Sequence, residues 1–95
     1  MEIVNFEESL AGSFELATFD IDMGAKWGII LRRFKLCKSK SGHHYFQSSS
    51  YKKGETDGKP NWMSYIHFYG DKGKDFSTAV MELLKPFLDQ AAVAF

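Results

Sequence analysis

Residues 26–69 read KWGIILRRFKLCKSKSGHHYFQSSSYKKGETDGKPNWMSYIHFY, and this stretch decides the fold. It contains runs rich in β-branched and aromatic residues, separated by polar segments that contain glycine. Such a pattern is typical of consecutive β-strands joined by hairpin loops. We therefore predict three strands here, over 27–38, 43–52 and 62–69.

The flanking segments add one strand and one helix. Residues 14–23 (FELATFDIDM) alternate apolar and acidic residues at their C-terminal end, which predicts a strand, and a change of parity within them indicates a β-bulge or burial on both faces. From Asp75 to about Leu88, apolar side chains recur at helical spacing. Pro86 disrupts a helix interior, so we expect a kink or a second short helix there. The predicted fold is α+β, a four-stranded antiparallel meander followed by a C-terminal helix (β-β-β-β-α).

The chain has 95 residues, which is room for one domain. We expect a lead-in segment over 1–12, an antiparallel sheet over 13–69, with the loop 53–61 inside it, and a C-terminal helix and tail over 75–95. The helix covers one sheet face, and the other face is exposed, closed by a second subunit or used for binding. Because so short a chain buries a modest core, we expect a homodimer.

We expect neither a secretory signal nor a membrane span in this sequence. The first twelve residues, MEIVNFEESLAG, lack the basic and apolar regions of a secretory signal. No apolar run approaches the ~20 residues that a membrane span needs. Cys37 is the only cysteine, which favours a reducing compartment. We therefore predict a cytoplasmic protein with no membrane association.

No motif for catalysis or metal binding stands out. His43 and His44 are adjacent and point to opposite faces of a strand, and an ordinary role for them and for His67 is favoured over metal ligation. Cys37 lies in KLCKS, and the serine run 48–50 has no context typical of a nucleophile. No glycine-rich phosphate-binding motif is present. We predict no enzymatic activity, no metal and no cofactor.

The net charge of zero conceals a division along the chain. Residues 1–25 carry six acids and no Lys or Arg, whereas residues 26–59 carry nine bases and two acids. Such asymmetry is typical of a polyanion-binding face. The alternative is that the acidic first strand neutralises a basic neighbour within the fold, and charge alone favours neither interpretation.

Basic residues interleave with aromatic residues on the predicted strands. Regular alternation places Arg33 and Lys35 on one face and Arg32 on the other face. Single-stranded nucleic acid is held by positive charge along its backbone and by aromatic rings that stack on its bases. Alternatively, the rings form an apolar layer at a dimer interface. The candidate nucleic-acid-binding residues are Trp27, Arg32, Arg33, Lys35, Tyr45, Tyr51, Lys52, Lys53, Lys59, Tyr65 and His67.

Short motifs follow one another along residues 31–84. In chain order they are Arg33-Phe34-Lys35-Leu36, Ser41-Gly42, Tyr45-Phe46, Lys52-Lys53 with Asp57-Gly58, Ile66-His67-Phe68 and Ala79-Val80. This succession resembles the stage V sporulation protein G (SpoVG) family of small nucleic-acid-binding proteins, although Ser50 stands where that family usually has proline. Four strands, a basic loop and a helix also resemble the single-stranded-DNA-binding fold of the PC4 coactivator and Whirly proteins. Both resemblances imply DNA or RNA binding by basic and aromatic strand residues.

We therefore expect a homodimeric protein that binds single-stranded nucleic acid, DNA rather than RNA, through a basic, aromatic sheet surface. The alternative is a small protein-interaction module, or a phage or host regulator, that binds and masks a protein partner. The acidic N-terminal segment would then imitate nucleic acid.

Overall fold

The computed structural model describes the backbone of residues 1–9 and 14–94 and the side chains of residues 1–9 and 14–88. Six strands and one helix follow one another along these residues. They are β1 (Glu2–Glu8), β2 (Glu15–Asp22), β3 (Ile30–Lys38), β4 (His44–Gln47), β5 (Ser50–Thr56), β6 (Lys59–Ser64) and α1 (Lys72–Ala94).

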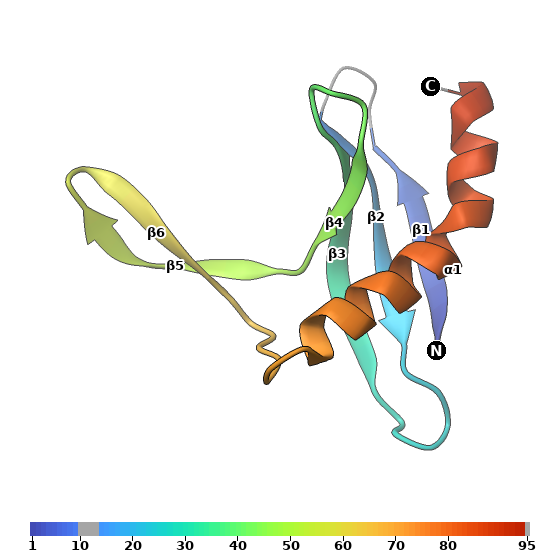
Figure 1. Ribbon diagram of the computed structural model, residues 1–95, viewed down its shortest axis with the longest axis horizontal. Coiled ribbons are helices and arrows are strands. Elements are labelled where there is room, and N and C mark those ends of the chain that lie inside the picture. Colours follow the sequence, from blue (N-terminus) through green and yellow to red (C-terminus); the bar gives the residue numbers. More distant parts are fainter. Residues whose placement is uncertain (10–13, 95) are drawn as a thin grey trace.

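The strands form two separate sheets. β1 to β4 make a four-stranded antiparallel sheet in the order β1-β2-β3-β4, and β5 pairs only with β6. α1 covers one face of the four-stranded sheet, which we call the inner face, and the β5–β6 hairpin extends away from both (Figure 1). We call this hairpin, residues 50–64, the arm. The α+β class, an antiparallel four-stranded sheet and the C-terminal helix are confirmed, whereas the predicted order β-β-β-β-α was wrong, because six strands precede the helix and two of them form a second sheet.

The strands of the sheet differ from those we predicted. The expected lead-in contains β1, which is the first strand of the meander. The expected strand over 43–52 is interrupted after Gln47 and resumes as β5 in the arm. The prediction of a strand over 62–69 holds only for residues 62–64, because β6 ends at Ser64. The predicted loop 53–61 lies wholly within the arm, where most of it is β-strand.

A bulge in β1 interrupts the alternation of apolar and polar residues, which explains why the sequence did not predict this strand. Asn5 has a φ of 53°, and the pairing register with β2 shifts around it. Ile3 is buried in the core, and Phe6 stacks on Phe87 of α1 with ring centroids 4.5 Å apart. Both side chains therefore face the helix although they are three positions apart, which an unbroken period of two does not allow.

The start of β3 also differs from the prediction. Residues 25–28 form a turn, in which the Trp27 N–H donates to the Gly24 carbonyl at 3.2 Å. Gly24 has a φ of 96°, which suits a residue without Cβ. Trp27 therefore lies on a turn and not on the predicted strand over 27–38, and β3 begins only at Ile30, whose side chain is exposed.

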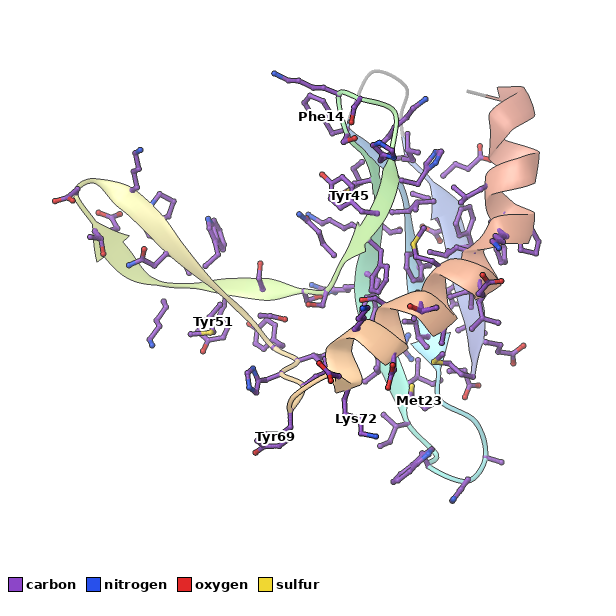
Figure 2. All side chains as sticks on the ribbon, in the orientation of Figure 1. Phe14, Met23, Tyr45, Tyr51, Tyr69 and Lys72 are labelled. Carbon is purple, nitrogen blue, oxygen red and sulfur yellow. The ribbon has the colours of Figure 1, made fainter. Side chains whose placement is uncertain are left out.

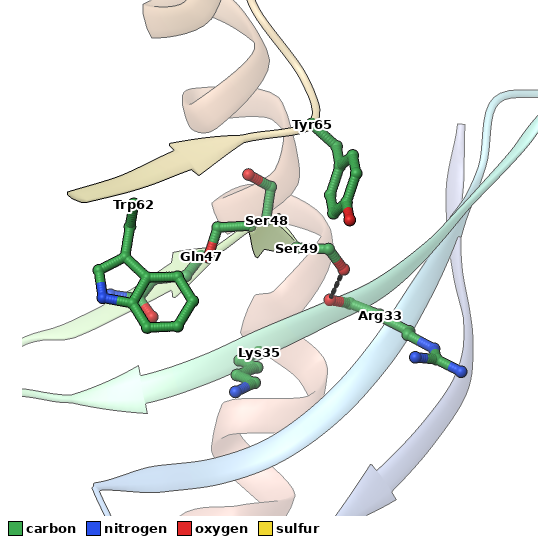
Figure 3. Close-up of a pocket in the computed structure, with 8 residues that line it drawn as sticks. Arg33, Lys35, Gln47, Ser48, Ser49, Trp62 and Tyr65 are labelled. Carbon is green, nitrogen blue, oxygen red and sulfur yellow. Dashed lines mark hydrogen bonds between the residues drawn. The ribbon is translucent and has the colours of Figure 1, made fainter. Parts of the chain in front are cut away.

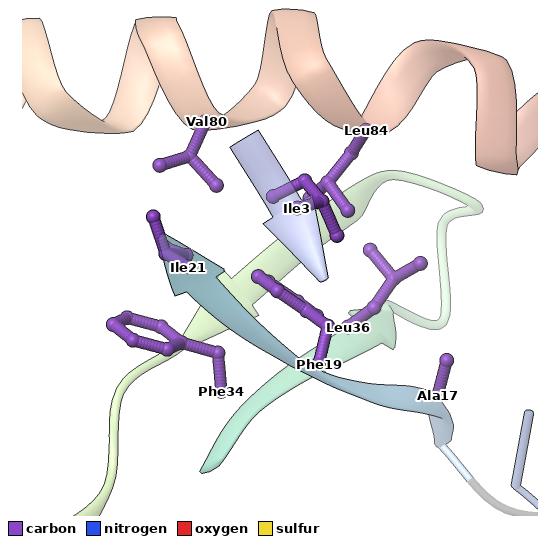
Figure 4. Packing of buried hydrophobic residues seen from close by; sticks show 8 residues of the cluster. All are labelled: Ile3, Ala17, Phe19, Ile21, Phe34, Leu36, Val80 and Leu84. Carbon is purple, nitrogen blue, oxygen red and sulfur yellow. The ribbon is translucent and has the colours of Figure 1, made fainter. Parts of the chain in front are cut away.

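The core fills the space between the inner face of the sheet and α1 (Figure 4). Its buried apolar side chains are Ile3, Ala17, Phe19, Ile21, Phe34, Leu36, Val80 and Leu84. Alternate positions of β2 and β3 face inward, and the two helix residues are one turn apart. Burying one large apolar side chain contributes ~1.5–3 kcal/mol, so this single layer dominates the stability.

α1 begins earlier than predicted and continues through Pro86 to Ala94. Proline removes one helical hydrogen bond and crowds the preceding turn. Figure 1 shows the helix bending partway along, so the sequence-based expectation of a kink holds and the second helix does not form. Within the described residues, no helix combines the length and apolar character needed to cross a membrane.

Candidate functional site

We call the face of the four-stranded sheet opposite α1 the outer face. A cleft of about 750 Å³ lies between this face and the base of the arm. β3 contributes Arg33 and Lys35 to it, and the opposite wall carries Trp62 of β6 and Tyr65 just beyond it (Figure 3). The remaining lining residues are Gln47, Ser48, Ser49 and Ser50. Among the described residues, the lining thus contains two cations, two aromatic rings and several hydroxyl groups, and no carboxylate.

The serine run creates this cleft by separating β4 from β5. Serine side chains readily bond to nearby groups in place of extending a strand ladder. Ser49 Oγ donates to the Arg33 carbonyl at 2.8 Å, and the hydroxyl oxygens of Ser48 and Ser64 are 2.6 Å apart. The Tyr65 N–H donates to the Ser49 carbonyl at 3.1 Å. The Ser49 side chain thus ties the base of the arm to β3, and the other two bonds hold the two ends of the arm together.

Both aromatic rings of the cleft are open to solvent. Trp62 is 63% exposed and Tyr65 is 68% exposed. Trp62 lies toward Lys35 and Gln47, and Tyr65 lies toward Arg33 (Figure 3). Folded proteins usually bury such rings or use them at interfaces. The Tyr65 ring also contacts the Tyr51 ring, with centroids 5.0 Å apart, so the cleft offers the Trp62 ring and the part of the Tyr65 ring that Tyr51 leaves exposed as surfaces on which a flat ligand can stack.

The basic residues near the cleft differ in their pairing. Lys35 Nζ lies 3.5 Å from Glu15 Oε1, and Arg32 Nη1 lies 3.0 Å from Asp20 Oδ2. No acidic side chain within residues 1–9 and 14–88 forms an ion pair with Arg33. Carboxylates of the fold thus neutralise the charge of Arg32 and part of the charge of Lys35. The charge of Arg33 stays available to an anionic ligand.

Asp20 is a carboxylate of the outer face that accepts three hydrogen bonds. It accepts from the Asn5 side-chain amide at 2.9 Å, from the Arg33 backbone N–H at 3.0 Å and from Arg32 at 3.0 Å. These donors, Asn5 first, hold the pKa of Asp20 below its ordinary value of 3.8, although partial burial acts in the opposite direction. Asp20 is therefore ionised at neutral pH.

A second groove, of about 310 Å³, adjoins the cleft on the outer face. It shares Arg33 and Lys35 with the cleft, but Glu7 and Asp20 also line it. These carboxylates repel an anionic ligand. Compared with this groove, the cleft is therefore better suited to a polyanion.

The structure brings three of the predicted site residues together, because Arg33, Lys35 and Tyr65 all line the cleft. Tyr45 lies on β4 and Tyr51 on the arm (Figure 2). Outside the cleft lining are Trp27 on the β2–β3 turn, Arg32 on β3, Tyr45 on β4, Tyr51, Lys52, Lys53 and Lys59 on the arm, and His67 before α1. Lys52 is also paired with Glu55.

Trp62 and Gln47 are cleft residues that the candidate set omits. Gln47 pairs with Lys35 in the β3–β4 register, so the shared strand face was a usable signal. Trp62 lies directly opposite Lys52 in the arm, which repeats the basic–aromatic pairing across strands. Its place in the cleft depends on the direction of the arm, which no local pattern specifies.

Cys37 is buried in the sheet, away from the lining of the cleft. Burial, followed by the charge of Glu15, raises the pKa of the Cys37 thiol above its ordinary value of 9.0. The sulfur is therefore protonated at neutral pH and is a weak nucleophile. Within the described residues, no three His, Cys, Asp or Glu side chains cluster in a way that could hold a metal ion.

Comparison of the chain with known protein families, with curated proteins and with solved structures gave no match in any of the three. The resemblances to the SpoVG family and to the PC4 and Whirly fold stay predictions.

Proposed function

We propose that this protein binds single-stranded nucleic acid in the cleft between β3 and the arm. The observation that carries the proposal is the lining, in which two exposed rings and two cations meet without a carboxylate. The preference for DNA over RNA follows from the resemblance to the PC4 and Whirly fold. We therefore propose that the nucleic acid contacts the cleft, and not the whole face of the sheet that the sequence suggested.

The cations supply the electrostatic part of the binding. Arg33 and Lys35 are two positions apart on β3, which separates their Cα atoms by roughly 7 Å along the strand. Side chains spaced in this way follow the path of a sugar-phosphate backbone. Each neutralised phosphate of a single strand contributes about 0.7 to the slope of log K against log salt, so binding weakens as salt rises.

The rings supply the part that selects single strands. Trp62 and Tyr65 are three residues apart, and aromatic stacking on a base is worth ~1–3 kcal/mol. Paired bases in a duplex already stack on each other, whereas the bases of a single strand are available to the rings. The amide of Gln47 and the hydroxyl of Ser48 add hydrogen-bonding groups between the two rings.

One observation favours a protein contact as a second candidate function. Tyr51 and Met63 lie opposite each other on the arm, and both side chains are exposed. A two-stranded hairpin is marginally stable alone, so a partner covering this pair would stabilise the arm. The expected homodimer would use this surface, and so would a different protein partner.

The test is fluorescence anisotropy of labelled single-stranded DNA, single-stranded RNA and duplex DNA, each at low and moderate salt. We expect the single strands to bind best and the affinity to fall with salt. Trp62→Ala should weaken binding by roughly 5- to 150-fold, which corresponds to the loss of one stacked base. Tyr69→Ala is the matched control, because Tyr69 is an exposed ring outside the cleft lining.

A second pair of variants tests the cations. Arg33→Ala with Lys35→Ala should weaken binding and lower the salt slope, whereas Lys38→Ala with Lys40→Ala removes two exposed lysines that do not line the cleft. If both double variants lose the same amount of affinity, the electrostatic contact is diffuse and is not made specifically at the cleft. Absence of binding to every oligonucleotide would leave the protein-contact function.

A further inference from the structure

The two neighbouring arginines of β3 lie on a β-bulge. The register between β2 and β3 shifts between Phe19 and Ile21, so Asp20 alone lies opposite both Arg32 and Arg33. Arg33 has a φ of 63°, which is uncommon for a residue with a side chain. Such a bulge bends the strand and redirects its side chains.

The bulge decides which side chains of β3 reach the outer face. Phe34 and Leu36 are buried in the core. Regular alternation from them would place Arg32 on the core side and Leu31 on the solvent side. Leu31 instead packs against the core, and Arg32 and Arg33 are both exposed. The bulge thus keeps a cation out of the core while Arg33 stays at the cleft.

Asp20 supplies the hydrogen bonds that close this bulge. Its Oδ1 accepts from the Arg33 backbone N–H at 3.0 Å. Its Oδ2 accepts from Arg32 at 3.0 Å and from Asn5 at 2.9 Å. The Asp20 side chain is only 13% exposed, so water competes weakly for these bonds. Strained backbone of this kind persists where its surroundings hold it.

We propose that Asp20 is a positioning residue for the nucleic-acid site. It holds the bulge that presents Arg33 to the cleft, and it keeps the Arg32 guanidinium engaged outside the cleft. This inference rests on the proposed function. Asp20 does not itself line the cleft, so its effect on the ligand passes through Arg33.

Positioning and simple charge predict opposite results for Asp20→Ala. Removing a carboxylate close to a bound polyanion should tighten binding if charge alone matters. If Asp20 positions Arg33, the same variant weakens binding of a labelled oligothymidylate and lowers the salt slope by about 0.7, the contribution of one phosphate contact. Anisotropy titrations at several salt concentrations measure both quantities.

Two matched variants separate the hydrogen bond from the charge. Asp20→Asn keeps an oxygen that can accept from the Arg33 N–H and removes the charge, so it should bind at least as tightly as the wild type with an unchanged salt slope. Asp22→Ala removes a neighbouring carboxylate of β2, which accepts from Gly24 and makes no hydrogen bond to the bulge in the described structure. It should not weaken binding.

A double-mutant cycle then shows whether Asp20 acts through Arg33. In the Arg33→Ala background, Asp20→Ala should cause no further loss of affinity, because the contact that it positions is already absent. A further loss of the same size would overturn the proposal. Asp20→Ser, which shortens the side chain and withdraws the acceptor, replaces Asp20→Ala if that variant does not fold.

The outcomes also distinguish this inference from the function on which it rests. A wild-type protein that binds no oligonucleotide overturns both. A wild-type protein that binds single strands, with an Asp20→Ala variant that binds equally well or more tightly, overturns the positioning role alone. Weakened binding in Asp20→Ala together with full binding in Asp20→Asn supports it.

Discussion

The body of the molecule, β1 to β4 with α1, and the arm are built from similar hydrogen-bonded strands, but only the body has a core. In the body, β2 alternates buried and half-buried side chains along its length. In the arm, every residue of β6 is exposed, and so is every residue of β5 except Gly54, which is half-buried. Both regions thus contain paired strands, but only the strands of the body bury side chains against a helix. The region without a core carries the exposed ring of Trp62.

Hydrogen exchange should show the largest difference between the two regions. Amides of the body open mainly by global unfolding, at ~5–15 kcal/mol, whereas arm amides open locally at little cost. We expect arm amides to exchange about a thousandfold faster or more, measured by mass spectrometry or NMR. Added single-stranded DNA should slow exchange in the arm. Equal protection in both regions of the free monomer would contradict the comparison.

A large-to-small substitution should lower the free energy of unfolding by several kcal/mol more in the body than in the arm. Phe34 is buried, and its ring centroid lies 5.6 Å from that of Phe19 and 6.0 Å from that of Phe46. Phe34→Ala should lower the free energy of unfolding by ~3–5 kcal/mol in urea titrations. Trp62→Ala is the control in the arm and should cost less than about 0.5 kcal/mol. A loss of similar size from Trp62→Ala would mean that the arm packs on the body.

Acid should weaken the body through Asp20. Its folded-state pKa is lowered below 3.8, so its stabilising effect is fully present above that pH and is lost as the pH falls through the folded value. The measurement compares the unfolding free energies of the wild type and of Asp20→Asn between about pH 5 and pH 2. Their difference should shrink toward acid. A constant difference would show that the ionised carboxylate contributes nothing.

The smallest effect is expected on the solvent side of α1. Lys85 Nζ lies 2.9 Å from Glu82 Oε1, and both side chains are more than half exposed. Exposed helix pairs of this kind are worth ~0.3–0.5 kcal/mol. Lys85→Ala should therefore change the free energy of unfolding by less than about 0.5 kcal/mol, measured with and without high salt. A loss above about 1 kcal/mol would indicate that the Lys85 stem covers apolar surface.

Sequence patterns located the elements whose periodicity is intact. The two central strands and the helix were predicted from alternation and from the apolar stripe. The parity change between Leu16 and Phe19 indicated a bulge or burial on both faces, and the register of β2 with β3 does shift, between Glu15 and Ala17. At Arg32 the same logic failed, because the bulge opposite Asp20 turned this side chain from the predicted face to the outer face.

The composition of the arm explains why the sequence did not predict it. Residues 53–61 contain two glycines, a proline and several charges, which is typical of a loop. The overlooked signal is Asp57-Gly58, where φ is 53° and 77° and where two residues join β5 to β6. An Asp-Gly pair with positive φ at both positions is a favoured hairpin turn. The cleft needed one more fact, the direction of the arm, which arises from the serine bonds at its base.

The covering of a single sheet face by α1 also has a consequence for the order in which the protein is made. The inner face of the sheet is complete once β4 has been synthesised, but Val80 and Leu84, which cover it, come more than thirty residues later. Contacts between such distant segments form slowly compared with local ones. A growing chain therefore displays Phe19, Phe34 and Leu36 until α1 leaves the ribosome, and this interval is when a chaperone has most to bind.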